Sequence, residues 1–402
     1  MGVSQSPTDT VLITGGGGYF GHRLGCKLQE SGIQVILFDI HQPSLGIPEG
    51  MRFIRGDVRS VSDLERAFSG VSCVFHTASY GMSGREQLQR RMIEEINVKG
   101  TENVIQACIS QGVGRLVYTS TFNVVFGGQE IKNGNESLPY LPLHLHPDHY
   151  SRTKSIAEMK VLKANDSLLN AGCGRRLKTC TLRPAGIYGP GEQRHLPRII
   201  GYLETGLFKF LYGDPSNLVQ FVYVDNLVTA HVLAAESLTP DKNYIAAGQP
   251  YFISDGSPVN NFEFFRPLVE GLGYKFPTIR LPLYVVYFAA FLTEWVHFLI
   301  SPVYNFQPLL TRTEVYKTGV THYFSNDKAR RDLGYEPSGF TMHEVADWFK
   351  AHGFSCQDRK VKGRNYMWDV LFVLLVFVAV LSWFPKAVAA DEEPLLNPLC
   401  SS

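Results

Sequence analysis

The segment Thr10-Val-Leu-Ile-Thr-Gly-Gly-Gly-Gly-Tyr-Phe-Gly21 carries the strongest structural signal in the chain. Its apolar first half predicts a strand, and the helix-period residues that follow it predict a helix. Gly15, Gly18 and Gly21 stand between the two in a G-x-x-G-x-x-G register. A turn without side chains lets backbone N–H groups approach a pyrophosphate, which the helix N-terminus then stabilises. Glycine clusters also form ordinary turns, so the interpretation as a dinucleotide-binding turn depends on its surroundings.

The surrounding sequence supplies that context, because short apolar strands alternate with helix-period segments over the first 190 residues. This alternation is typical of a doubly wound α/β fold, in which helices cover both faces of a parallel sheet. Helices are expected after Tyr19, after Val61, and over residues 86–111 and 149–170, whereas the Gly- and Pro-rich residues 127–146 are expected to form a loop. The expected strands are Thr10–Thr14, Gln34–Asp39, Arg52–Gly56, Ser72–His76, Arg115–Ser120 and Lys178–Arg183.

Pro and Gly residues become more closely spaced after residue 190, which indicates that a less regular lobe begins there. We therefore expect a Rossmann domain over residues 8–190, completed by segments near 215–250. A smaller substrate lobe is expected over residues 191–350.

Asp39 ends the second expected strand, VILFD, where a dinucleotide-binding fold places an acidic residue against the adenosine ribose. A carboxylate at this position accepts hydrogen bonds from the ribose hydroxyls and repels a 2′-phosphate. The sequence therefore predicts NAD rather than NADP as the cofactor, although a surface turn would also tolerate an aspartate.

Tyr150 and Lys154 stand four residues apart in an expected helix and therefore share one face of it. A neighbouring cation stabilises a phenolate and lowers its pKa, which makes the phenol a usable acid or base. The spacing is weak support by itself, because both residue types are common. The strand Arg115–Ser120 strengthens it, since the hydroxyl cluster of Ser120 and Thr121 falls at the carboxyl edge of the sheet, where doubly wound folds bind ligands.

These motifs together resemble the extended short-chain dehydrogenase/reductase superfamily, and within it the 3β-hydroxysteroid dehydrogenase/isomerase family and its 42E branch. The resemblance covers roughly residues 8–350. Asn226 stands where the family often has a second acidic residue, and Thr121 where it often has serine. Besides the glycine turn Thr14–Gly21, the matching segments are Asp57-Val58, His76-Thr-Ala78, Asn97-Val-Lys-Gly-Thr-Glu-Asn103, Leu182-Arg-Pro-Ala-Gly-Ile-Tyr-Gly-Pro190 and Phe221-Val-Tyr-Val-Asp225-Asn226.

The resemblance implies roles for individual residues. Tyr150 is the expected catalytic acid/base, and Lys154 lowers its pKa and binds the nicotinamide ribose. Thr121 is the expected hydroxyl partner by position, with Ser120 as the alternative. Asn97 is expected to order the backbone around the cofactor. Contacts with NAD are expected from Gly15, Gly18, Tyr19, Phe20, Gly21, Asp39, Asp57, Val58, Thr77, Ala78, Asn97, Lys154 and Pro184.

The implied reaction is the NAD-dependent oxidation of a 3β-hydroxysteroid or sterol to a ketone, or the reverse. No residue can be assigned to a following double-bond isomerisation. A nucleotide-sugar epimerase or dehydratase of the same superfamily is the main alternative, and its diphosphate would require basic groups such as Arg194, His195 and Arg198. A non-catalytic NAD-sensing protein is a third interpretation, against which stands the presence of both Tyr150 and Lys154.

Two apolar stretches favour contact with membrane lipid. Residues 370–384, VLFVLLVFVAVLSWF, are uncharged, and a helix over 366–390 would reach across a bilayer. The basic linker 354–365 before it and the acidic residues after it predict a catalytic domain on the cytosolic side. The family resemblance, rather than this pattern, implies the endoplasmic reticulum as the membrane. The second stretch, 281–304, contains Glu294 and His297, so it is interpreted as an interfacial helix, with a membrane span or an amphipathic helix of the lobe as alternatives.

Composition excludes several other classes. The 402 residues include 38 Lys+Arg and 37 Asp+Glu, a net charge of +1, which gives no electrostatic reason to expect a nucleic-acid partner. The seven cysteines show no metal-ligand spacing, so we expect no metal site and a reducing compartment. A homodimer remains open.

Overall fold

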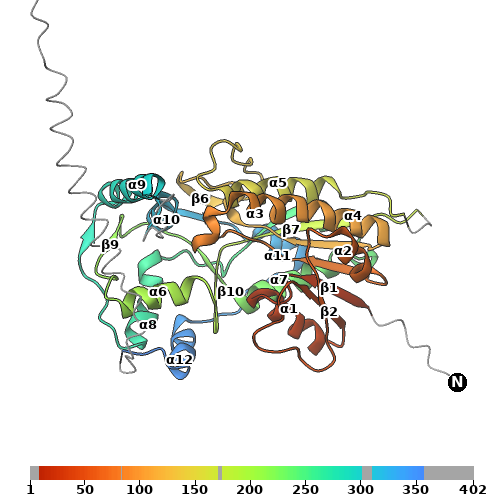
Figure 1. The fold of residues 1–402 in the computed structure, drawn as a ribbon, viewed down its shortest axis with the longest axis horizontal. Coiled ribbons are helices and arrows are strands. Elements are labelled where there is room, and N and C mark those ends of the chain that lie inside the picture. Colours follow the sequence, from red (N-terminus) through yellow and green to blue (C-terminus); the bar gives the residue numbers. More distant parts are fainter. Residues whose placement is uncertain (1–8, 83, 171–173, 301–309, 357–402) are drawn as a thin grey trace, which may run out of the picture.

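The computed structural model describes residues 9–356 apart from 83, 171–173 and 301–309. Within this range, seven parallel strands form the central sheet in the order β11-β7-β5-β4-β1-β2-β3 (Figure 1). The strand order reverses between β1 and β4, which is where doubly wound sheets bind their ligands. The strands are β1 (Thr10–Thr14), β2 (Gln34–Asp39), β3 (Arg52–Arg55), β4 (Cys73–His76), β5 (Arg115–Thr119), β7 (Lys178–Pro184) and β11 (Gln249–Ile253).

The six strands expected from the sequence are confirmed, each within one residue at either end. Alternation along β1 explains why the sheet is covered on both faces. Val11 and Ile13 pack with α1 and α7, whereas Leu12 packs with α2, α4 and α5 on the opposite face. These helices are α1 (Tyr19–Glu30), α2 (Val61–Phe68), α4 (Thr101–Gln111), α5 (His149–Lys163) and α7 (Val224–Glu236).

Two details of the predicted Rossmann domain are wrong. The expected helix over residues 86–111 is divided into η1 (Gly84–Leu88), α3 (Arg90–Glu94), the π-helical segment η2 (Glu95–Gly100) and α4. A π-helical turn contains one extra residue, and the spacing of apolar residues in the sequence does not reveal it. The expected loop 127–146 contains β6 (Ile131–Gly134), which pairs with β13 (His322–Phe324). Its partner is almost two hundred residues away, so local sequence does not reveal it.

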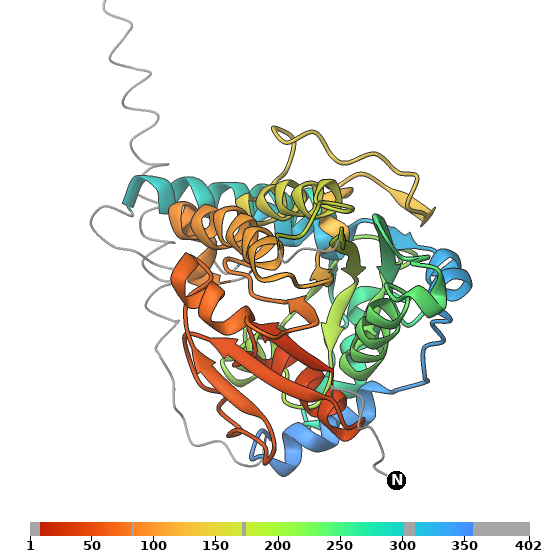
Figure 2. The same cartoon turned by 90° about the vertical axis from the view of Figure 1, so that its right-hand side faces the viewer.

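A second lobe lies beside the sheet domain, at the left of Figure 1. Its helices are α6 (His195–Glu204), α8 (Asn261–Gly271), α9 (Leu283–Ile300), α10 (Arg312–Gly319) and α12 (Met342–Ala351). Short parallel pairs link it together, β8 (Gly186–Tyr188) with β10 (Phe221–Tyr223) and β9 (Leu211–Tyr212) with β12 (Arg280–Leu281). The helix α11 (Asp327–Leu333) then returns to the sheet domain and packs on α7 and β11 (Figure 2).

The apolar stretch 281–304 is largely accounted for by α9, which packs on α10. Val286, Ala290 and Val296 are buried in the lobe, and Glu294 pairs with Arg312 of α10 at 2.8 Å. Among the described residues, none of the helices combines the length and apolarity needed to cross a bilayer. The predicted transmembrane helix 366–390 lies outside the described residues, as does most of the linker 354–365.

Candidate active site

A cleft of about 940 Å³ follows the carboxyl edge of the sheet and continues between the sheet domain and the second lobe. It is formed by the ends of β1, β4, β5 and β7 on one side and by α6 and α10 on the other. Asn97 is absent from its lining. The predicted site residues that line it are Gly15, Gly18, Tyr19, Phe20, Gly21, Asp39, Asp57, Val58, Thr77, Ala78, Ser120, Thr121, Tyr150, Lys154 and Pro184.

The glycine turn has the form that a pyrophosphate requires. Gly15 has φ +74°, and a Cβ there would lie 2.8 Å from the backbone nitrogen of Ala78. A Cβ on Gly21 would collide with the carbonyl of Gly15. Gly18 is the N-cap of α1, and within this described turn no side chain caps the helix and no acidic residue occupies its first turn. The positive end of α1 is therefore available to an anion.

Asp39 lies at the end of β2, beside the glycine turn. Its carboxylate accepts hydrogen bonds from the backbone N–H groups of Gly17 at 3.0 Å and His41 at 3.2 Å. These bonds fix the carboxylate at the cleft while leaving lone pairs for another donor. The arrangement fits a ribose that presents two hydroxyl groups, and a phosphate on that ribose would meet a fixed negative charge.

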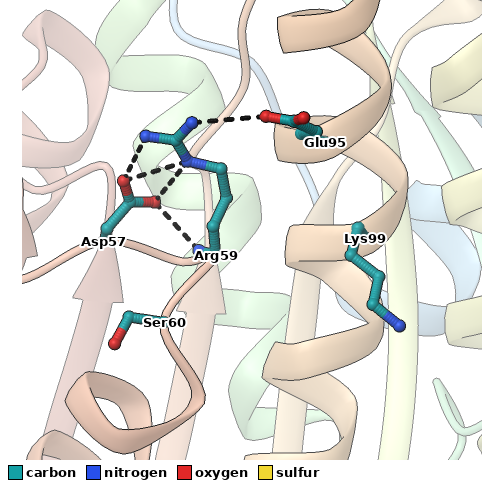
Figure 3. Close-up of a pocket in the computed structure, with 5 residues that line it drawn as sticks. All are labelled: Asp57, Arg59, Ser60, Glu95 and Lys99. Atoms are coloured by element: carbon teal, nitrogen blue, oxygen red, sulfur yellow. Dashed lines mark hydrogen bonds and ion pairs between the residues drawn. The ribbon is translucent and has the colours of Figure 1, made fainter.

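A smaller groove of about 370 Å³ adjoins the end of β3 and is lined by Asp57, Arg59, Ser60, Glu95 and Lys99 (Figure 3). Arg59 pairs with Asp57 at 2.6 Å and with Glu95 at 3.4 Å. The hydrogen bond from Arg59 holds the pKa of Asp57 below its ordinary value. The Asp57 carboxylate, which was expected to contact NAD, is thus already engaged by Arg59, a neighbour that the sequence pattern did not single out.

Tyr150 is positioned by the first turn of α5. Asp148 is the N-cap of this helix and accepts a hydrogen bond from the Ser151 N–H at 2.6 Å. The phenol is 6% exposed, and burial raises the pKa of Tyr150 to about 12. The positive charge of Arg194 and a hydrogen bond with the Ser79 hydroxyl act in the opposite direction and lower it. The resting phenol is therefore a weak acid.

Lys154 lies one turn further along α5 and is 2% exposed. Its ammonium donates to the carbonyl of Thr119 at 2.5 Å and lies 4.2 Å from the centre of the Tyr118 ring. Burial lowers the pKa of Lys154 to about 7, and the charge of Glu158 partly opposes this fall. The largest charge that lowers the pKa of Tyr150 is that of Arg194 in the second lobe.

The hydroxyl groups of Ser120 and Thr121 differ in their partners. Ser120 donates its proton to the buried carboxylate of Glu158, behind the cleft. Thr121 accepts a hydrogen bond from the Asn123 N–H at 3.3 Å, which leaves its own proton available to an oxygen in the cleft. The geometry favours Thr121 over Ser120 as the donor to a substrate.

Asn97 acts behind the wall of the cleft. It lies on the π-helical segment η2, where its side-chain oxygen accepts a hydrogen bond from the Tyr80 N–H at 2.8 Å. Its side-chain nitrogen donates to the Tyr80 carbonyl at 2.9 Å and to the hydroxyl of Thr153 on α5 at 3.0 Å. It therefore ties the loop after β4 to the helix that carries Tyr150. This agrees with the expectation that Asn97 orders backbone.

The charged groups of the second-lobe part of the cleft are paired with one another. Arg198 binds both oxygens of Glu314, one of them at 2.9 Å. Glu192 caps α6, because its carboxylate accepts hydrogen bonds from three backbone N–H groups at 2.7 to 2.8 Å. Burial lowers the pKa of His195. Arg194 makes a looser contact, 3.2 Å from Glu86 across the mouth of the cleft. Apart from Arg194, this region offers an anion few ready cations.

Comparison with known proteins places these features in context. Residues 12–283 match the model of the 3-beta hydroxysteroid dehydrogenase/isomerase family. The chain is 67% identical to the short-chain dehydrogenase/reductase family 42E member 1 of Xenopus laevis, over 96% of this chain and 100% of that one. It is 36% identical to the mouse sterol-4-alpha-carboxylate 3-dehydrogenase (decarboxylating), over 86% and 90% of the two chains.

Among solved structures, the UDP-glucose 4-epimerase of Thermus thermophilus in complex with NAD has a similar fold. The TM-score is 0.63 at 23% identity, over 85% of this chain and 99% of that one. The likeness extends through both lobes, so the second lobe as well as the sheet domain follows the extended short-chain dehydrogenase/reductase architecture.

Proposed function

The chain belongs to the 3-beta hydroxysteroid dehydrogenase/isomerase family, and we propose that it is an NAD-dependent oxidoreductase that interconverts the hydroxyl and keto forms of a steroid or sterol. The observation that carries the proposal is the convergence of Thr121, Tyr150 and Lys154 in one cleft, next to a glycine turn shaped for a dinucleotide. The family membership and the sterol dehydrogenase among its relatives support the substrate class.

Three groups of the chain would hold the cofactor. The uncapped N-terminus of α1 would receive the pyrophosphate, Asp39 the adenosine ribose, and Lys154 the nicotinamide ribose. NAD⁺, when bound, supplies the hydride acceptor for the carbinol carbon. The pKa of Tyr150, which burial raises to about 12, would fall if a cationic nicotinamide were bound nearby.

The residues of the chain provide the acid and base chemistry. In oxidation, Tyr150 as phenolate takes the proton from the substrate hydroxyl, while Thr121 donates a hydrogen bond to the same oxygen and holds it in place. In reduction, Tyr150 returns the proton to the carbonyl oxygen. Lys154 contributes a positive charge one helical turn from Tyr150, and Arg194 adds charge from the opposite lobe.

The second-lobe part of the cleft supports an apolar substrate. Leu207, Phe208, Phe210, Phe262 and Leu310 line it. Two of the positive groups that a sugar nucleotide would use are engaged, since Arg198 is held by Glu314 and the N-terminus of α6 by Glu192. Arg194 makes only the looser contact with Glu86. A diphosphate carries two or more charges and would have to displace these pairs, at the cost of leaving buried groups unpaired.

Membrane attachment would bring such an enzyme to its substrate. The outer face of α9 exposes Tyr284, Phe288, Trp295 and Phe298, with side chains that are 51 to 75% exposed. Amphipathic helices with aromatic residues on one face insert into the bilayer interface. α9 is therefore proposed as an interfacial helix, in cooperation with the apolar residues 366–390, on the cytosolic face of the endoplasmic reticulum.

The test is turnover by the purified full-length protein in detergent, followed by the absorbance of reduced cofactor. A panel of 3β-hydroxysteroids and sterols is compared with UDP-glucose and UDP-galactose, and Tyr150→Phe is assayed alongside. Loss of the acid/base is expected to reduce kcat by about 10²- to 10⁴-fold. Turnover of UDP-sugars alone would favour an epimerase, and binding of NAD without any turnover would favour a sensor. Full activity of Tyr150→Phe would refute the assignment of the base.

A further inference from the structure

Glu158 lies one turn beyond Lys154 on α5, completely buried behind the active site. One carboxylate oxygen accepts the hydroxyl proton of Ser120. The other accepts three hydrogen bonds, from the Tyr140 hydroxyl at 2.7 Å and from Nε and Nη2 of Arg183 at 2.9 and 2.6 Å. Glu158 thus joins the helix of the catalytic pair to β5, β7 and the loop before α5.

Stability alone does not account for this arrangement. The side chains of Glu158 and Arg183 are 0 and 2% exposed, so both charges have lost their hydration. A buried ion pair seldom stabilises a fold more than a well-packed apolar pair of the same volume. Arg183 is also enclosed by the rings of Tyr140 and Phe252, whose centres lie 5.3 and 5.1 Å from its guanidinium carbon. Glu158 therefore places a charge at a buried position where an apolar residue would serve stability equally well.

The groups bound by Glu158 are neighbours of the catalytic groups. Ser120 stands between Thr119, whose carbonyl receives the Lys154 ammonium, and Thr121, whose hydroxyl faces the cleft. Arg183 immediately precedes Pro184, which lines the cleft. Fixing Ser120 and Arg183 therefore fixes the strand ends that orient Lys154, Thr121 and the cofactor.

The charges around Lys154 show why the sign of Glu158 matters. His76 on β4 is buried, and burial lowers its pKa to about 3, so it remains neutral. Tyr118 on β5 presents its ring, and Tyr150 on α5 its phenol. Arg183 on β7 is a cation behind Glu158. Glu158 is the acidic group whose charge favours the protonated form of Lys154, against burial.

For the dehydrogenase reaction proposed above, we infer that Glu158 is a positioning residue that fixes Ser120 and Arg183. Its negative charge acts on the cations of both Arg183 and Lys154. Its charge keeps Lys154 cationic, one helical turn from Tyr150. Glu158 is not among the residues that line the cleft, and it acts through the ammonium of Lys154.

The first experiment is the pH profile of kcat/KM for steroid oxidation. Glu158→Gln removes the charge but leaves Arg183 buried without an anion, so Glu158→Gln/Arg183→Met is made as well, to remove both charges. In both proteins, kcat/KM is expected to begin its fall at alkaline pH about one pH unit lower than in the wild type, because Lys154 loses its proton more readily. Tyr140→Phe is the matched control, since it removes one hydrogen bond from Glu158 and keeps the charge. It should lower stability without moving the pH at which this fall begins.

The second experiment does not depend on turnover. Urea unfolding of the cofactor-free protein is measured from pH 5 to 10, with and without Lys154→Met. The pKa of Lys154 is lowered on folding, so the unfolded chain binds more protons above about pH 7, and the stability penalty of Lys154 is relieved as the pH rises from there. In the Glu158→Gln/Arg183→Met background this relief should begin about one pH unit lower.

The inference would be overturned if the variants fell at the same alkaline pH in kcat/KM and began to gain stability at the same pH as their parents. A uniform loss of activity or stability would then show that Glu158 is merely structural. If the relief shifts but no steroid is turned over by the wild type, the charge coupling stands and the proposed function fails.

Discussion

Lys317 of the second lobe donates to Asp148, the residue that caps the helix of Tyr150, at a distance of 3.0 Å. The two side chains are 23 and 12% exposed, so water screens this pair less than it would a surface pair. Burial acts to raise the pKa of Asp148, but the charge of Lys317 and the cap hydrogen bonds outweigh it and hold that pKa below its ordinary value. The substrate lobe thus acts directly on the start of the catalytic helix.

A double-mutant cycle of Asp148→Asn and Lys317→Met is expected to give a coupling free energy of about 1 kcal/mol in urea unfolding at pH 7. Because the pKa of Asp148 is lowered in the folded state, this contribution should be complete above the ordinary pKa of a carboxylate, about 4, and lost as the pH falls below it. The pair Lys27 and Glu30 is the control, since its side chains are 57 and 64% exposed and its coupling should be a few tenths of that size. Equal coupling in the two cycles would contradict the role given to the cap.

Arg194→Met is predicted to slow oxidation at neutral pH. Arg194 is the main charge that lowers the raised pKa of Tyr150, so its loss raises that pKa further and decreases the fraction of phenolate at any given pH. We expect kcat/KM for oxidation to fall about 10-fold at pH 7 to 8, with recovery as the pH increases. Arg194→Lys, which keeps the charge, is the control, and equal losses in the two variants would contradict the mechanism.

The parts of the structure that were predictable depend on local chemistry. The glycine turn, Asp39 and the spacing of Tyr150 and Lys154 each arise from residues close together in the chain, and the structure brings them to one cleft. The doubly wound parallel sheet was predictable from the alternation of strands and helices, and the structure adds the order of its strands. Apolar strands six residues or fewer in length were located because both of their faces are buried.

The parts that were missed depend on contacts between distant segments. Ser79 reaches Tyr150 from the loop after β4, and Arg194 reaches the same phenol from the second lobe. Ser120 is the alternative hydrogen-bond donor to the substrate, but its hydroxyl donates to Glu158, 38 residues later in the chain. Such partners carry no signature of their own in a single sequence. For Ser79, its place directly after the motif His76-Thr-Ala78 was the available signal.

Asp39→Ser is predicted to relax the preference for NAD. The carboxylate is fixed at the cleft by the N–H groups of Gly17 and His41, so a 2′-phosphate in that place would be repelled. Removal of the charge should raise the ratio of kcat/KM with NADP to that with NAD by about 10-fold or more, equivalent to roughly 1.4 kcal/mol. Asp57→Asn is the comparison, because that carboxylate is engaged by Arg59 and is expected to leave the ratio unchanged. The ratio is measured with each cofactor at saturating steroid.

The outer face of α9 gives a prediction about membranes. Trp295 and Phe298 are 51 and 75% exposed, whereas Val296 between them is buried in the lobe, so substitutions on the outer face should leave the fold intact. Phe288→Glu/Trp295→Glu should reduce cosedimentation of the full-length protein with phosphatidylcholine vesicles, because a charge at the interface opposes insertion of the aromatic face. Leu45→Glu is the matched control, since Leu45 is an apolar side chain 80% exposed on the Rossmann domain. A loss of binding that is equal in the two proteins would show that α9 has no special part in attachment. Undiminished binding of the α9 variant, with normal binding of the control, would assign attachment to residues 366–390 alone.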